Sequence, residues 1–230
     1  MIYQPSEAKI AYDKYHRSFM VCGAAAHEGA YQIAHSLLED SLKIENDQKN
    51  DEFQIKLDDS MITSLMLNDI FFVSAVDNFN CYLSEIIILI LNVDPRPIYG
   101  KKIDAKLAFS ISDIQSLRQE FIDMKVLELG YQKIDELSDF LLKNFEISAL
   151  SNRLTSLRLN RIVQVRNIIS HNRGVANRLF MERSASKTDH IGTHVKAGHA
   201  IRAASYLETL IEKIDREAVS KFEINGDSLA

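Results

Sequence analysis

The sequence predicts an all-α protein, a helical bundle with an N-terminal helical extension. Long stretches carry apolar residues at helical spacing, whereas the apolar and polar alternation typical of β-strands is scarce. Three prolines and eight glycines in 230 residues leave few points at which a helix must stop. A chain of this length can form one sizeable domain with a filled core, and its 46% hydrophobic content is ordinary for a soluble protein.

The first predicted helix begins after Ser6, whose hydroxyl can cap it, and continues to about Lys43. We expect residues 1–45 to be a helical extension that packs on the core. Residues 44–60 are polar and acidic, and we interpret them as a surface connection. The chain start lacks the basic and then apolar layout of a secretory signal, so we expect a cytoplasmic protein.

The second predicted helix, from about Met61 to Val93, is apolar on nearly all sides, which indicates a helix in the centre of its domain. Its most hydrophobic run starts at Ile86, is too short to span a bilayer and is interpreted as core. A polar stripe also follows this helix at spacings of three and four: Ser74, Asp77, Asn78, Cys81 and Glu85. Because buried carboxylates need partners, we expect Asp77 or Glu85 to lie against Arg166 as a supporting group. The alternative is that the stripe reaches solvent.

The remaining helices are predicted from their start and stop signals. Prolines after Asp94 end the long helix, because proline lacks the backbone donor and disfavours helix before it. Ser112 and Asp113 are predicted to cap a helix that runs to about Leu129, and further helices are expected over residues 134–145 and about 196–222. The last of these has a predicted inner face of Ala200, Ala203, Ala204, Leu207, Leu210, Ile211 and Ile214. Residues 58–222 are expected to form one helical domain, compact together with the extension.

Neither the cysteines nor the histidines predict a metal site. Cys22 and Cys81 are far apart and have apolar neighbours, so we expect small buried side chains in a reducing compartment. His190, His194 and His199 lie in a polar connection that lacks a cysteine or a spaced carboxylate pair. We expect no metal there, and we interpret the segment as an RNA contact or a plain solvated loop, mobile until substrate binds.

The helix before the last carries the candidate functional residues. From Arg161 to Gly174 it reads R-I-V-Q-V-R-N-I-I-S-H-N-R-G, and it is expected to open at Ser148 or Ser151. Wound as a helix, the stretch gathers its polar side chains on one face: Asn160, Gln164, Arg166, Asn167, Ser170 and His171. Ile162, Val165, Ile168 and Ile169 fall on the opposite face. Gly174 predicts the end of the helix, because glycine enters the left-handed conformation without steric cost.

Charge is concentrated around this helix. The whole chain has a net charge of -5, which argues against a general nucleic-acid coat protein. Residues 147–181 nevertheless contain no acidic residue and six arginines: Arg153, Arg158, Arg161, Arg166, Arg173 and Arg178. Arginine suits bidentate recognition of phosphate, so a local anion site is predicted. Alternatively the arginines pair with acidic neighbours, and Arg158 and Arg161 point to the apolar side of the wheel.

The sequence R-N-I-I-S-H from Arg166 to His171, followed by N-R-G, resembles the motif of the HEPN superfamily. That family carries an arginine, a polar residue, a short spacer and a histidine near the end of one helix. The resemblance implies a HEPN-like helical domain and a metal-independent endoribonuclease that acts as a homodimer, with the motif at the shared cleft. It also implies a toxin–antitoxin or other defence setting, with RNA as substrate and an antitoxin protein as a possible partner.

The chemistry expected of these residues follows from their types. His171 can accept or donate a proton near neutral pH, Arg166 can fix and stabilise the phosphate, and Asn167 can orient the imidazole or a phosphate oxygen. Substrate binding is expected from Gln164, Ser170, Asn172, Arg173 and Arg178. No cofactor and no membrane contact are expected. Two alternatives remain: a non-catalytic HEPN-like dimer that binds RNA, a nucleotide or a partner protein, and a helical scaffold.

Overall fold

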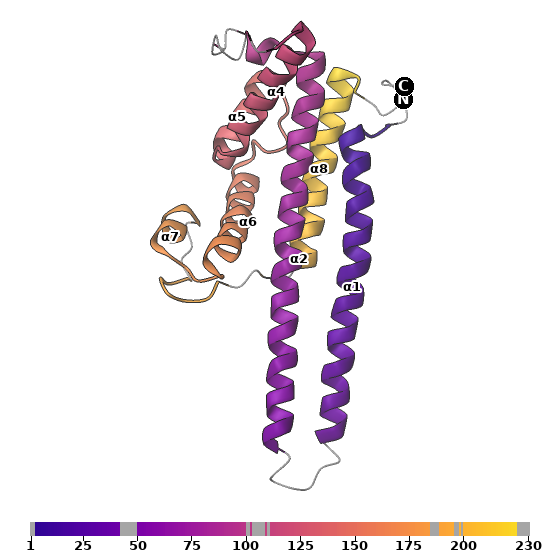
Figure 1. The fold of residues 1–230 in the computed structure, drawn as a ribbon, viewed down its shortest axis with the longest axis vertical. Coiled ribbons are helices and arrows are strands. Elements are labelled where there is room, and N and C mark those ends of the chain that lie inside the picture. The colour runs from indigo at the N-terminus through magenta and orange to yellow at the C-terminus, as the bar shows by residue number, and fades with distance from the viewer. Residues whose placement is uncertain are drawn as a thin grey trace. The chain divides into compact units, whose positions relative to one another are not determined.

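The computed structural model describes residues 3–41, 50–99, 102, 109, 111–184, 189–195, 198 and 200–224, and most side chains between residues 19 and 64 lie outside the description. The described residues form seven α-helices, one 3-10 helix and no β-strand, which confirms the all-α class (Figure 1). In chain order the elements are α1 (Glu7–Ser41), α2 (Asn50–Val93), η2 (Arg96–Ile98), α4 (Ile114–Gly130), α5 (Ile134–Phe145), α6 (Arg153–Asn172), α7 (Arg178–Ser184) and α8 (Ala200–Phe222).

Most helix ends lie where their local chemistry predicts them. The Ser6 hydroxyl accepts a hydrogen bond from the backbone N–H of Lys9 at 3.1 Å and so caps α1. Asp113 is extended and accepts from the backbone N–H of Ser116 at 2.8 Å, as expected of the cap of α4. The predicted start of α6 is wrong, because Asn152 rather than Ser148 or Ser151 caps that helix, accepting from the N–H of Leu154 at 2.8 Å.

Helix α2 is longer than its hydrophobic pattern predicts. It begins at Asn50, so the prediction of a connection is wrong for residues 50–60, and residues 44–49 lie outside the described residues. The segment from residue 50 to 60 contains no glycine or proline, and its Glu, Gln, Lys and Leu residues are good helix formers. Low hydrophobicity therefore does not interrupt the helix.

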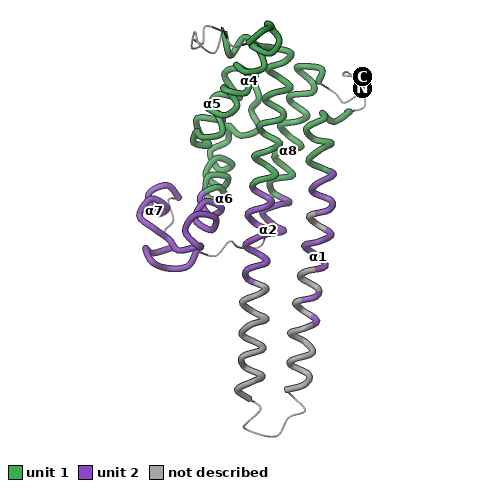
Figure 2. The backbone as a smooth tube through the Cα atoms, in the orientation of Figure 1, with its two compact units in different colours: residues 1–13, 77–163, 206–230 green, residues 14–76, 164–205 purple. Residues whose placement is uncertain are grey.

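The chain divides into two compact units (Figure 2). Unit 1 contains residues 1–13, 77–163 and 206–230, and unit 2 contains residues 14–76 and 164–205. Helices α1, α2, α6 and α8 each contribute residues to both units. The expected division at residues 45 and 58 stays a prediction.

The core of unit 1 forms around the C-terminal part of α2. Phe79, Ile86 and Ile90 are fully buried, so the prediction that this apolar run is core is confirmed. The ring of Phe145 at the end of α5 packs edge-on against Phe222 of α8, with ring centres 5.8 Å apart. The predicted inner face of α8 is confirmed too, since each of its seven residues is at most 8% exposed.

Unit 2 differs from the sequence-based expectation for α2. Leu65, Met66 and Ile70 are 62%, 61% and 57% exposed, so the prediction of a helix buried on all sides is wrong for this part of α2. Across the described residues, one helical stretch, Leu65–Val93, is long and apolar enough to cross a membrane by length and composition. Core helices of soluble proteins share that property.

A buried carboxylate in unit 1 attaches the N-terminal segment to two helices. Asp215 of α8 is fully buried and accepts hydrogen bonds from the hydroxyls of Tyr3 and Ser6. It also accepts from the backbone N–H of Ser6 at 3.1 Å and from the hydroxyl of Tyr82 in α2 at 3.2 Å. Burial, with the neighbouring carboxylate second in importance, raises the pKa of both phenols.

Both cysteines are free and exposed, so the prediction of buried side chains is wrong. Cys22 lies on α1 and Cys81 on α2, on faces of these helices that solvent reaches. Partial burial of the Cys81 thiol raises its pKa, and the carboxylates of Glu85 and Asp77 raise this pKa further. The apolar residues next to each cysteine in the sequence do not indicate which face of the helix the cysteine occupies.

Candidate active site at the end of helix α6

The part of α6 that lies in unit 2 presents the motif as the sequence predicts. Val165 and Ile168 are buried, at 4% and 5% exposure, and form the apolar face. On the other face Ser170 and His171 are exposed, while Gln164, Arg166 and Asn167 are partly exposed. Solvent therefore reaches the imidazole and the cation from the same end of the helix.

Arg166 and Asn167 are joined by a hydrogen bond. The guanidinium Nη1 of Arg166 donates to the side-chain oxygen of Asn167 at 3.1 Å. This contact fixes the guanidinium of a partly exposed arginine, which would otherwise sample many rotamers. The predicted role of Asn167 in orienting the imidazole or a phosphate oxygen stays a prediction.

The end of α6 is shaped by two residues with left-handed backbone. Arg173 and Gly174 have φ values of 53° and 74°, which confirms Gly174 in the conformation predicted for it. The N–H of Gly174 donates to the carbonyl of Ile168 at 3.0 Å. The side chain of Asn172 donates to the carbonyl of Val175 at 2.5 Å, and so closes the turn. Arg173 is exposed beside this turn.

A second segment pairs with the residues that follow the helix. The N–H of Ala176 donates to the carbonyl of Thr193 at 2.8 Å, and the N–H of Val195 donates to the carbonyl of Gly174 at 2.7 Å. Val175 and His194 form an isolated antiparallel bridge. The described part of this segment is irregular and mostly exposed, as expected of a solvated loop, but backbone pairing anchors it to the end of α6, while residues 185–188, 196, 197 and His199 lie outside the described residues.

His194 brings a second imidazole to the end of α6. A Cβ atom built on Gly174 would lie 2.6 Å from Nε2 and 2.7 Å from Cε1 of His194, so the ring occupies the space that a side chain at residue 174 would need. His194 is exposed to solvent on its other side. Asp69 of α2 lies close enough that the charge of His194 lowers the pKa of its carboxyl, although burial has the larger, opposite effect and raises it. Sequence reasoning missed both as site residues, and no local pattern marks a contact between residues so distant in the chain.

Arg178 has an acidic partner. Its Nε donates to Glu182 at 2.9 Å across one turn of α7, and both side chains are largely exposed. An exposed pair of this kind is weak, at roughly 0.3–0.5 kcal/mol, so a phosphate can compete for the guanidinium. The pairing alternative thus holds for Arg178, and its role in substrate binding stays a prediction.

The arginines between residues 147 and 181 are divided between the units. Arg153, Arg158 and Arg161 belong to unit 1, and Arg166, Arg173 and Arg178 belong to unit 2. In unit 1 the guanidinium of Arg158 stacks over the ring of Tyr206, 3.7 Å from its centre. Arg158 is nevertheless exposed, so its expected position on the apolar side of the helix is wrong.

The predicted supporting carboxylates lie on the unit 1 part of α2. Asp77 is partly exposed and Glu85 is exposed, and partial burial raises the pKa of the Glu85 carboxyl. Their expected position against Arg166 stays a prediction. In unit 2, where the motif lies, the carboxylate of the same helix that responds to a histidine is Asp69, whose pKa the charge of His194 lowers against the larger effect of burial.

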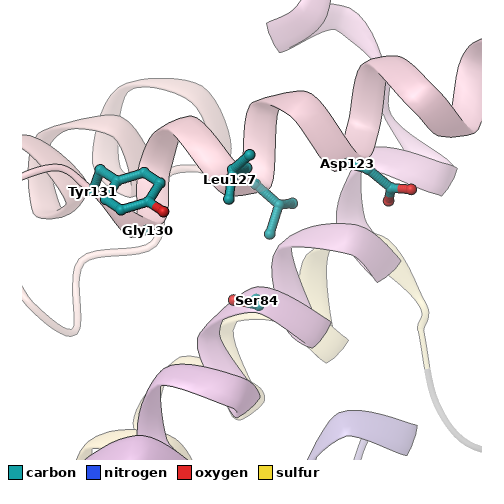
Figure 3. Close-up of a pocket in the computed structure, with 6 residues that line it drawn as sticks. Ser84, Asp123, Leu127, Gly130 and Tyr131 are labelled. Atoms are coloured by element: carbon teal, nitrogen blue, oxygen red, sulfur yellow. The ribbon is translucent and has the colours of Figure 1, made fainter.

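A pocket in unit 1 is separate from the motif residues. It has a volume of about 410 Å³ and is lined by Ser84, Asp123, Val126, Leu127, Gly130 and Tyr131. Figure 3 shows Asp123 and Leu127 on α4, Tyr131 directly after the end of that helix, and Ser84 on α2. None of the predicted site residues lines it. Over the described part of the chain, no group of three or more His, Cys, Asp or Glu side chains is arranged to hold a metal ion.

Comparisons with known proteins add no relative. No protein-family model matches the chain, and searches of curated proteins and of solved structures each gave no match.

Proposed function

We propose that the chain is a metal-independent endoribonuclease of the HEPN type, which cleaves RNA by attack of a ribose 2′-hydroxyl on the adjacent phosphodiester. The observation that carries the proposal is the arrangement at the end of α6. There an exposed imidazole, His171, and the partly exposed guanidinium of Arg166, which donates a hydrogen bond to Asn167, lie within the last two turns of the helix. The resemblance of R-N-I-I-S-H to the HEPN motif supports the same function.

Each residue has a defined part in the reaction. His171 accepts the proton of the 2′-hydroxyl, because a histidine changes charge near neutral pH and needs no metal to do so. Arg166 stabilises the negative charge that grows on the phosphate oxygens in the transition state. Asn167 holds that cation in place before substrate arrives, which removes an entropic cost from the reaction.

The surrounding polar residues are proposed to bind the RNA backbone. Ser170 and Arg173 are exposed next to the motif, and Gln164 and Asn172 are partly exposed. Arg178 can exchange its exposed pair with Glu182 for a phosphate oxygen. We propose a homodimer through the motif face, in a cytoplasmic toxin–antitoxin or other defence setting, with an antitoxin protein as a further partner.

Cleavage of RNA by the purified full-length chain tests the proposal. Arg166→Ala is expected to slow cleavage about 10²–10³-fold and His171→Ala about 10²–10⁴-fold, the ranges typical of electrostatic and proton-transfer groups. Arg96→Ala is the matched control, because Arg96 is an exposed arginine paired with Asp94 after α2. Chelator in the assay buffer should have no effect.

Three results would separate the alternatives. Cleavage that survives both motif substitutions would assign the activity to other residues or to a contaminant. An intact protein that binds RNA or a nucleotide but cleaves no RNA would support a non-catalytic module. Loss of thermal stability in both variants without any RNA binding by the parent chain would support a scaffold.

A further inference from the structure

The end of α6 carries two histidines, of which the sequence motif contains only one. His171 lies in the last turn of the helix, and the imidazole of His194 fills the space beside Gly174, three residues later. Three residues separate two Cα atoms by at most about 11 Å, and here the chain turns back, since the N–H of Gly174 bonds to the carbonyl of Ile168. Both imidazoles therefore belong to the same helix end, and both are exposed.

The position of His194 is built into the fold of unit 2. Its backbone is bridged to Val175, and its ring contacts a glycine whose φ of 74° disfavours any other residue. Further along the chain, the side chain of Asn68 in α2 donates to the carbonyl of Gly198 at 2.8 Å and accepts from the N–H of Ala200 at 3.1 Å. These contacts hold the segment on both sides of His194.

We propose that His194 is the second proton-transfer group of this site, so that a single chain supplies both the base and the acid for RNA cleavage. The proposal rests on the ribonuclease function proposed above. It keeps His171 as the base assigned above and gives the remaining proton transfer, to the 5′-oxygen, to His194, whose ring lies at the same helix end.

The step balances without a further reactant. Neutral His171 takes the proton of the 2′-hydroxyl while the 2′-oxygen forms a bond to phosphorus. The bond from phosphorus to the 5′-oxygen breaks, and protonated His194 gives its proton to that oxygen. The products are a 2′,3′-cyclic phosphate and a 5′-hydroxyl, and the two imidazoles have exchanged protonation states. The step requires each ring nitrogen to come within about 2.6–3.2 Å of its oxygen.

A change of leaving group tests the role of His194 directly. Once a preferred cleavage site has been mapped, an RNA oligonucleotide is made with sulfur in place of the bridging 5′-oxygen at that site. Sulfur leaves without a proton, so His194→Gln should slow cleavage of the oxygen substrate at least about 100-fold and that of the sulfur substrate less than about 10-fold. His171→Gln should slow both substrates. Lys143→Gln, at an exposed residue of α5 outside this segment, should change neither.

The outcomes distinguish this inference from the proposed function. Normal cleavage by His194→Gln, with activity still dependent on His171, would overturn the inference and leave the proposed ribonuclease standing. An equal loss on both substrates would also overturn it, because it would indicate a role in packing or phosphate binding. A parent chain without ribonuclease activity would remove both proposals.

Mixing two inactive variants gives an independent test that does not depend on a substrate analogue. If acid and base come from one chain, mixed dimers of His171→Gln and His194→Gln contain no complete site and stay inactive. If the two groups come from different subunits, one site in each mixed dimer is complete and cleavage returns, which would overturn the assignment to a single chain. Thermal unfolding of each variant beforehand shows that both are folded.

Discussion

Replacing Asp215 with asparagine is expected to destabilise the protein strongly although it changes the side-chain volume very little. The carboxylate is fully buried and accepts four hydrogen bonds, from Tyr3, from Tyr82 and from the hydroxyl and N–H of Ser6. Asparagine removes the charge and turns an NH₂ group toward hydroxyl and N–H donors. Hydrogen bonds to a charged group contribute about 1.5–3 kcal/mol each, and a buried donor left without an acceptor costs about 1–3 kcal/mol.

Because these contributions are not additive and the hydroxyls can rotate, we expect Asp215→Asn to lower the free energy of unfolding by about 2–4 kcal/mol. For a chain of this size that corresponds to a fall in Tm of roughly 4–16 °C. Urea unfolding followed by circular dichroism measures the difference. The matched control is Asp139→Asn, which breaks an exposed pair with Lys143 and should cost no more than about 0.5 kcal/mol.

A loss of less than about 1 kcal/mol for Asp215→Asn, or one equal to that of the control, would contradict the reasoning. It would mean that water or other groups satisfy the donors around residue 215 as well as the carboxylate does. The attachment of the N-terminal segment to α8 would then contribute little to the stability of unit 1.

Two further predictions concern single contacts. Gly174→Ala should lower the free energy of unfolding by about 2–3 kcal/mol. Two effects add up: alanine is strained at a positive φ, and its Cβ would collide with the ring of His194. Gly198→Ala has the same φ of 74° but open space around it, so in the same urea assay it should lose at least about 1 kcal/mol less, and equal losses would refute the contact. Burial and a neighbouring carboxylate raise the pKa of Tyr82, so the stabilisation by its neutral hydroxyl is complete below pH ~10 and is lost as the pH rises further, because only the unfolded state then ionises. Urea unfolding between pH 9 and 11.5 should show a shallower fall in stability for Tyr82→Phe than for the parent chain, whereas Tyr131→Phe, at an exposed tyrosine, should leave the fall unchanged.

The sequence was most informative where a helix carries both a periodic apolar face and clear end signals. Helix α5 runs over the predicted residues 134–145, and α4 begins after its predicted cap, Asp113. The inner face of α8 was predicted residue by residue because its alanines and leucines recur at helical spacing. In these helices local propensity, capping and burial all favour the same structure.

The wrong predictions have a common physical cause, because the composition of a segment does not indicate which other parts of the fold it packs against. The polar residues 50–60 were interpreted as a connection because they have few apolar side chains to bury, yet they continue α2. Cys22 and Cys81 were expected to be buried from their neighbours in sequence, although the face of the helix decides exposure.

Only the part of the candidate site that lies on and directly after one helix, α6, was predicted. Arg166, Asn167, His171 and Gly174 are related by helical spacing, and the sequence alone placed them together. His194 reaches them through backbone pairing between two irregular segments, and Asp69 reaches His194 from another helix. Contacts of that kind depend on the fold and leave no periodic signal in the sequence.

The interleaving of the two units constrains how this gene can be shortened. Unit 1 is drawn from three separate stretches of chain and unit 2 from two, so no continuous fragment contains either one complete. A stop codon ahead of residue 206 would delete the aspartate to which Tyr3 and Ser6 donate. During synthesis Tyr3 and Ser6 therefore acquire this partner only after more than 200 further residues have been added.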